Sequence, residues 1–169
     1  MAELRVINVY PETVSDGFGI RYGIYFAGCS HRCAGCHNPQ SWNPHSGKVL
    51  DEMFFEQIVR GILANPLLDG VTLSGGDPFF NAEEIFVFLK NLKERTNVNV
   101  WCYSGYTYEQ LAADPARAPS LKFIDVLVDG PFVDKLANPR LFFRGSANQR
   151  ILKLSDGKLA GIMEPEINL

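Results

Sequence analysis

The sequence predicts an α/β fold with a mainly parallel sheet. Three observations indicate this class: apolar strand-like segments alternate with amphipathic helical segments, turn-forming residues separate the two, and no internal repeat, low-complexity segment or long linker interrupts them. The chain has 169 residues, which is enough for one domain with its own hydrophobic core. We therefore expect a single domain over residues 1–169.

The first predicted unit is a strand followed by a long loop and a helix. Residues 21–27 (RYGIYFA) are aromatic and apolar, which is typical of a strand. They lead into residues 28–45, whose content of Gly, Ser, His, Asn and Pro indicates a loop. Residues 51–64 are predicted as a helix because apolar side chains recur at helical spacing, acidic residues open the segment and Asn65-Pro66 ends it.

The second unit is a shorter strand followed by a second helix. Residues 70–74 (GVTLS) form an apolar segment of strand length, and the Gly-Gly-Asp-Pro sequence at residues 75–78 indicates a tight loop after it. Residues 82–96 carry apolar side chains on one helical face. The pattern then returns to a strand at residues 98–104 (VNVWCYS).

The last part of the chain continues the alternation. We predict a short helix at residues 107–113, a fourth strand at residues 123–129 (FIDVLVD) and a fifth strand at residues 149–154 (QRILKL). Because ligands bind at the carboxyl ends of the strands in parallel sheets, the loops after the first four strands are expected to meet at one edge and form a composite site. These loops are residues 28–45, 75–78, 105–107 and 130–132.

Composition and charge exclude several classes of function. The formal net charge is −3, whereas nucleic-acid-binding domains usually carry a basic excess. No apolar run is long enough to span a membrane, and the charged residues 1–12 do not resemble a secretion signal. We therefore expect a cytoplasmic protein without nucleic-acid or membrane partners. In that reducing compartment, metal binding or redox chemistry explains cysteines better than structural disulfides do.

Three of the four cysteines form a cluster in the sequence. Cys29, Cys33 and Cys36 lie within eight positions of a predicted loop, whereas Cys102 lies in a predicted strand and is interpreted as a core residue. An iron–sulfur cluster uses all three thiolates of the loop. Cubane clusters normally have four thiolate ligands, so three thiolates would leave one iron open as a binding site.

Two other interpretations of the three thiols are possible. A structural zinc site needs four ligands, and one of three histidines would have to complete it: His31, His37 or His45. A catalytic thiol activated by a neighbouring histidine needs only one cysteine and leaves the other two without a role. The iron–sulfur interpretation is favoured because it accounts for the whole cluster of thiols.

The residues of this loop and of the Gly-Gly-Asp-Pro loop resemble a known superfamily. The spacing Cys29-x3-Cys33-x2-Cys36 resembles the signature of the radical S-adenosylmethionine enzymes, and LSGGDP at residues 73–78 resembles their glycine-rich loop. The resemblance implies a [4Fe–4S] cluster whose fourth iron is chelated by the methionyl amine and carboxylate of S-adenosylmethionine. It also implies a reduced, partial (β/α) barrel of the radical S-adenosylmethionine type.

A narrower resemblance covers nearly the whole chain. CAGCHNPQSW at residues 33–42 is similar to the cluster loop of the glycyl-radical activating enzymes, and residues 126–151 closely resemble the activating proteins of the anaerobic, class III ribonucleotide reductases. The similarity extends over about residues 5–154, whereas the tail at residues 155–169 matches nothing of use. The implied reaction is reductive cleavage of S-adenosylmethionine to a 5′-deoxyadenosyl radical, which generates a glycyl radical on anaerobic ribonucleoside-triphosphate reductase.

The resemblance assigns roles to the residues of the composite site. Cys29, Cys33 and Cys36 are expected to ligate three irons. The expected contacts to S-adenosylmethionine come from Gly35, His37, Gly75, Gly76, Asp77 and Ser104, with Asp129 as a further candidate. The two adjacent glycines are expected to bring the backbone close to the methionyl end, and Asp77 is expected to accept a hydrogen bond from its amine, directly or through a water. No side chain is expected to act as a general acid or base.

The resemblance also implies partners. The glycyl-radical subunit of the reductase is the macromolecular substrate, and a flavodoxin or ferredoxin is the expected electron donor. The basic residues Arg140, Arg144, Arg150 and Lys153 form either a solvated face or a docking surface. Alternative functions are the activation of another glycyl-radical enzyme such as pyruvate formate-lyase, a radical reaction on a small metabolite, or a non-enzymatic iron–sulfur or zinc module.

Overall fold

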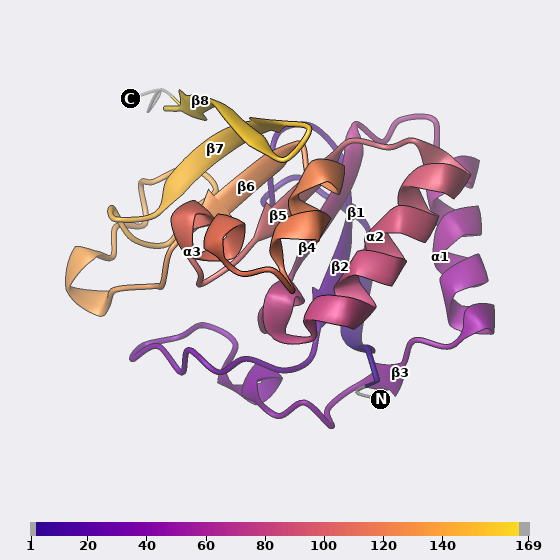
Figure 1. Ribbon diagram of the computed structural model, residues 1–169, viewed down its shortest axis with the longest axis horizontal. Coiled ribbons are helices and arrows are strands. Elements are labelled where there is room, and N and C mark those ends of the chain that lie inside the picture. Colours follow the sequence, from indigo (N-terminus) through magenta and orange to yellow (C-terminus); the bar gives the residue numbers. More distant parts are fainter. Residues whose placement is uncertain (1–2, 166–169) are drawn as a thin grey trace.

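A mixed sheet of eight strands runs through residues 3–165, the part of the chain that the computed structural model describes (Figure 1). The strands are β1 (Arg5–Thr13), β2 (Arg21–Phe26), β3 (Lys48–Val49), β4 (Gly70–Gly75), β5 (Val100–Tyr103), β6 (Val126–Asp129), β7 (Arg150–Ser155) and β8 (Lys158–Met163). The helices are α1 (Glu52–Ala64), α2 (Ala82–Thr96) and α3 (Tyr108–Ala113). Short 3₁₀ turns lie at Pro39–Trp42, Pro78–Phe80, Ala118–Phe123 and Asp134–Leu136.

The centre of the sheet consists of four parallel strands. The order across the whole sheet is β3-β1-β2-β4-β5-β6-β7-β8, and β2, β4, β5 and β6 pair in parallel. These are the first four strands that the sequence predicts, and α1, α2 and α3 lie in the crossovers between them. Because each crossover returns the chain to the same end of the sheet, the carboxyl ends of all four strands share one edge.

The flanks of the sheet are antiparallel, so the prediction of a mainly parallel sheet is wrong. Four pairings are antiparallel: β1 with β2, β1 with β3, β6 with β7 and β7 with β8. Residues 14–20 join β1 to β2, and Asp156-Gly157 joins β7 to β8. Both connections are too short for the crossover that parallel pairing requires. The sheet is open, with β3 and β8 at its edges, and the predicted partial barrel is not confirmed.

The three predicted helices are present, each within one residue of its predicted ends. The carboxylate of Asp51 caps α1 by accepting the N–H of Phe54 at 2.8 Å. Thr107 and Gln110 form a reciprocal capping box at the start of α3. In the described part of the chain, none of the helices has the length and apolar composition needed to cross a membrane.

Three strands of the sheet were not expected from the sequence: β1, β3 and β8. The fifth predicted strand corresponds to β7, and the chain then turns directly into β8. β8 lies in the tail at residues 155–169, of which the structure describes the part up to residue 165. Most of its side chains are exposed, and its sequence, KLAGIM, has no apolar–polar alternation and is interrupted by Gly161, so it gives no clear strand pattern.

The main core lies between the sheet and the helices. Buried side chains of α1 and α2 pack against strand residues such as Ile24 and Leu73. β5 shows how the two faces of the sheet differ, because Cys102 belongs to this main core whereas its neighbour Trp101 belongs to a smaller cluster with Val128. The helices therefore cover one face, while loop residues such as Phe143 pack against the smaller cluster.

Replacing Leu73 by alanine tests the packing of the central strands. Leu73 is fully buried in β4, so Leu73→Ala removes apolar contacts and leaves a cavity. We expect the free energy of unfolding to fall by about 2–5 kcal/mol. Leu63→Ala is the matched control because Leu63 on α1 is 60% exposed, and its effect should be about 0.5 kcal/mol or less. Urea denaturation followed by circular dichroism measures both, and equal losses would contradict this description of the core.

Candidate functional site

The loops that follow the four parallel strands meet at one edge of the sheet, as the sequence predicts. Three backbone hydrogen bonds join them: Gly76 N–H donates to Phe26 O (2.8 Å), Asp77 N–H to Gly28 O (2.8 Å) and Gly130 N–H to Tyr106 O (3.1 Å). The first two connect the glycine-rich loop to the start of the cysteine loop. The third connects the loops after β5 and β6, and the bond from Gly105 N–H to Oδ2 of Asp77 (2.9 Å) joins the two pairs of loops into one composite site.

The packing of these loops requires Gly75 and Gly76. Gly75 has a φ of +105°, in the left-handed region that favours glycine, and a Cβ atom there would lie 2.4 Å from the backbone nitrogen of Phe26. A Cβ atom on Gly76 would lie 2.4 Å from the carbonyl oxygen of Gly28. The backbone of the glycine-rich loop therefore lies directly against the end of β2 and the first residues of the cysteine loop.

The carboxylate of Asp77 is buried and binds groups from three loops. It is 2% exposed, and its oxygens accept backbone N–H bonds from Phe79 and Gly105, both at 2.9 Å. The hydroxyl of Ser104 lies 3.1 Å from both oxygens. His31 donates its Nε2–H to Oδ2 over 2.7 Å, because an ionised carboxylate can only accept. These four donors offset the cost of burying the charge.

The three loop cysteines are free thiols in partly exposed positions. The backbone N–H of Asn38 donates to the sulfur of Cys36 at 3.4 Å, and Cys36 N–H donates to the carbonyl of Cys33 at 3.1 Å. Burial raises the pKa of the Cys29 thiol, and hydrogen bonds from the loop backbone act in the opposite direction. Hydrogen bonds to sulfur favour the thiolate, which is the form that binds metal.

The three loop thiols are donors of the kind that iron–sulfur clusters use. Within residues 3–165, no three His, Cys, Asp or Glu side chains converge on one point as the ligands of a single metal ion do. A structural zinc ion needs four ligands around one atom. The thiolates of a cubane cluster bind different irons and therefore lie farther apart. Three free thiols on one loop are the donor set that such a cluster needs.

Cys102 is a core residue, as the sequence predicts. It is fully buried in β5 among the apolar side chains of the main core. Burial raises the pKa of this thiol well above its ordinary value, which keeps it protonated. Its sulfur donates weakly to the carbonyl of Tyr103 at 3.6 Å. The fourth cysteine of the chain is therefore not presented to the cysteine loop.

The segment after β6 packs against the two residues that flank the third cysteine. A Cβ atom on Gly35, whose φ is +75°, would lie 2.8 Å from Oδ1 of Asp134. The ring of His37 lies 5.2 Å from the ring of Phe132. The structure thus brings the two predicted neighbours of Cys36 together with the loop after β6, which the sequence predicts at this edge, although neither Phe132 nor Asp134 is a predicted site residue.

Asp129 lies at the same edge but is held in an ion pair. It is buried, and it accepts the Nε–H of Arg150 at 3.0 Å and the backbone N–H of Tyr108 at 2.7 Å. Arg150 also pairs with Glu109 at 2.7 Å. The hydrogen bonds to Asp129 and Glu109 raise the pKa of the Arg150 guanidinium. Arg150 is therefore used inside the fold, and Arg144 likewise donates to a backbone carbonyl at 2.8 Å.

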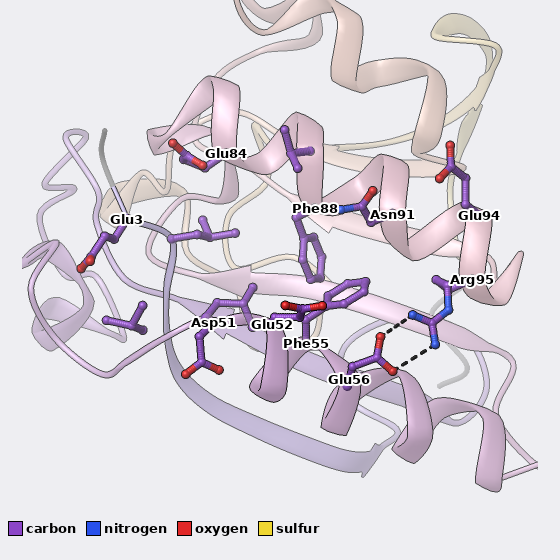
Figure 2. A pocket seen from close by; sticks show the side chains of 14 residues that line it. Glu3, Asp51, Glu52, Phe55, Glu56, Glu84, Phe88, Asn91, Glu94 and Arg95 are labelled. Atoms are coloured by element: carbon purple, nitrogen blue, oxygen red, sulfur yellow. Dashed lines mark hydrogen bonds and ion pairs between the residues drawn. The ribbon is translucent and has the colours of Figure 1, made fainter.

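A cavity of about 610 Å³ lies between α1 and α2 and contains none of the predicted site residues. Figure 2 shows the rings of Phe55 and Phe88 between the two helices, with carboxylates around them and Arg95 bound to Glu56. Six carboxylates and one guanidinium line the cavity. It offers no thiol or imidazole ligand, so the chemistry expected from the motifs is not assigned to it.

Comparison with known proteins identifies the family. A family model described as a 4Fe-4S single cluster domain matches residues 15–152. The anaerobic ribonucleoside-triphosphate reductase-activating protein of Haemophilus influenzae is 36% identical over 152 residues, which cover 88% of this chain and 97% of the relative. The chain belongs to the family of anaerobic ribonucleoside-triphosphate reductase-activating proteins.

Other activating proteins of this family match over similar lengths. The protein of Pasteurella multocida is 36% identical over 156 residues, covering 90% of this chain and 99% of the relative. The protein of Escherichia coli strain K12 is 34% identical over 144 residues, covering 83% of this chain and 92% of the relative. The family predicted from the motifs is confirmed, and with it the prediction that the chain is an activating enzyme with an iron–sulfur domain.

Adding a methyl group to Gly76 tests the contact between the two loops of this activating protein. Gly76→Ala places a Cβ atom against the carbonyl of Gly28, so the backbone must shift. We expect the free energy of unfolding to fall by about 1–3 kcal/mol. Gly161→Ala is the control because a Cβ atom on Gly161 meets nothing within 4 Å. Thermal and urea denaturation measure both variants, and a Gly76→Ala protein as stable as the control would refute the contact.

Proposed function

We propose that the chain binds a [4Fe–4S] cluster and S-adenosylmethionine and generates a glycyl radical on anaerobic ribonucleoside-triphosphate reductase. The observation that carries the proposal is the contact between the three-cysteine loop and the Gly75-Gly76-Asp77 loop, through the bond from Asp77 N–H to Gly28 O. One loop provides three thiols, and the other provides backbone without side chains beside them. The names of the relatives support the reductase as the partner.

In this proposal, Cys29, Cys33 and Cys36 each bind one iron of the cluster. Cys102 is buried in the core, so the fourth iron is left for a ligand other than a cysteine of this chain. That ligand is the methionyl amine and carboxylate of S-adenosylmethionine. Gly35 and His37 flank the last thiolate and lie beside the adenosyl group.

The glycine-rich loop holds the methionyl end of the cofactor. Gly75 and Gly76 line this position with backbone groups. The four hydrogen bonds that the neighbouring Asp77 carboxylate accepts hold this backbone in place. The Asp77 oxygens already accept these four hydrogen bonds. For the methionyl amine to donate directly to Asp77, an oxygen must accept the amine in addition to one of these donors or in place of it. Ser104 acts through Asp77, to which its hydroxyl is bound at 3.1 Å.

The cofactors supply the chemistry, and the chain supplies their positions. Held by Cys29, Cys33 and Cys36, a reduced cluster would supply the one electron that splits S-adenosylmethionine into methionine and a 5′-deoxyadenosyl radical, and that radical would take a hydrogen atom from a glycine Cα of the reductase. No side chain of this chain has to transfer a proton. Asp129 and Arg150 keep β6 beside β7, so the loop after β6 stays against the cysteine loop.

The position of the thiols suits two protein partners. Cys33 and Cys36 are partly exposed and His37 is exposed, so a loop of the reductase can approach the site from outside. The same exposure allows a flavodoxin or ferredoxin to deliver the electron, since electron transfer between proteins needs a short distance rather than a bound substrate. Such donors and the reductase are cytoplasmic, and we place this protein with them.

Electron paramagnetic resonance tests the proposal as a whole. The chain is reconstituted anaerobically with iron and sulfide, reduced with dithionite and measured with and without S-adenosylmethionine. We expect a reduced [4Fe–4S] signal whose shape changes when the cofactor is added, because the cofactor binds the open iron. A signal whose shape is unchanged by S-adenosylmethionine, or bound zinc in place of iron, would overturn the proposed function.

Removing one thiol tests the ligand assignment. Cys33→Ala should abolish both the cluster signal and the cleavage of S-adenosylmethionine to 5′-deoxyadenosine, because two thiolates do not hold a stable cubane. Cys102→Ala is the matched control, since its thiol lies in the core, and it should retain iron and sulfide at the wild-type ratio. Iron analysis and chromatography of the products measure both variants. Retained cleavage in Cys33→Ala would exclude this cysteine as a ligand.

A further inference from the structure

We propose that His31 is a positioning residue that fixes the distance between the three thiols and the Gly75-Gly76 backbone. This inference rests on the proposed function, because it assigns to His31 a part in the binding of S-adenosylmethionine. His31 lies between two cysteines of the loop, and its Nε2–H donates to Oδ2 of Asp77 at 2.7 Å. Asp77 directly follows the two glycines, so this side-chain hydrogen bond joins the middle of the cysteine loop to the glycine-rich loop, in addition to the backbone bond from Asp77 N–H to Gly28 O at the start of the cysteine loop.

The cysteine loop has few other attachments. Its beginning is held by backbone bonds from Gly28 to Ser41 and from Cys29 to Trp42. Between residues 30 and 37, the bond from His31 to Asp77 is the single hydrogen bond that reaches another described part of the chain. Loss of this bond therefore leaves the middle of the loop held by packing alone, of the His31 ring against Tyr106 and of Gly35 and His37 against the segment after β6.

The surroundings of His31 form a fitted position for an imidazole. A Cβ atom on Gly105 would lie 2.4 Å from the ring, so the glycine provides the space that the ring fills. Tyr106 packs edge to face against the ring at 4.4 Å, and Arg117 lies over the Tyr106 ring at 4.8 Å. The side chain of His31 is 17% exposed. The ring is thus held from three sides and directed at one carboxylate oxygen.

The expected consequence concerns cofactor affinity and not cluster retention. All three thiolates remain in a His31 variant, so iron should bind as in the wild type. S-adenosylmethionine has to contact the open iron and the glycine-rich loop at the same time. If the cysteine loop moves, the iron lies at the right distance from the glycine-rich loop in only a fraction of the molecules, and the apparent affinity falls by that fraction. Since a hydrogen bond to a charged group is lost, we expect the cofactor to bind about 10- to 100-fold more weakly.

The test compares four proteins: wild type, His31→Ala, His31→Gln and His45→Ala. Glutamine keeps an N–H donor at a similar reach and should restore much of the affinity. His45 is exposed and its ring forms no hydrogen bond with any residue among 3–165, so His45→Ala controls for loss of an imidazole. Each protein is reconstituted anaerobically, its iron content is measured, and S-adenosylmethionine is titrated against the paramagnetic resonance signal of the reduced cluster.

A second measurement does not depend on the cluster. Hydrogen–deuterium exchange of the full chain before reconstitution should be faster over residues 30–37 in His31→Ala than in the wild type, with β4 unchanged. Unchanged exchange, unchanged cofactor affinity or loss of iron in His31→Ala would each overturn the inference. A wild-type protein whose signal ignores S-adenosylmethionine would instead overturn the proposed function, so the two failures are distinguishable.

Discussion

The buried carboxylate of Asp77 is the constraint on which the arrangement of the site depends. A charge that is 2% exposed is stable only if donors surround it, and the nearest donors belong to three different loops. The chain must therefore bring His31, Ser104 and Gly105 to the same point for the fold to form without an uncompensated charge. The geometry of the composite site follows from satisfying this one group.

The mixed sheet explains how so short a chain builds a site from four loops. The four parallel strands direct their following loops to one edge, which is the property that enzymes with larger parallel sheets also use. The antiparallel strands at the flanks widen the sheet through short connections. These flanking strands extend the sheet on both sides of its parallel centre. The edge that carries the composite site is formed by the four central strands.

The sequence predicts the parallel centre well and the flanks poorly. The βα units have clear periodicity, whereas β3 has two residues and β8 (KLAGIM) has no alternation and contains Gly161, so neither has a strand pattern to recognise. Strand direction is also absent from such patterns, since it depends on the connections. In the site, the motifs predict which residues matter, but the contact of His31 with Asp77 spans 46 positions. The requirement for Gly75 comes from the backbone of Phe26, which has no sequence signal.

The placement of the thiols also determines the order in which the working protein can be assembled. All three lie on a loop outside the main core, and the core is complete without them. A zinc finger, by contrast, has no folded state before its metal binds. Under the proposed function, the core needs no thiol of this loop for its packing, so iron and sulfide can be delivered to a chain that is already folded. Oxidative loss of the cluster would then leave an intact apoprotein that can be reloaded rather than a protein that must be degraded.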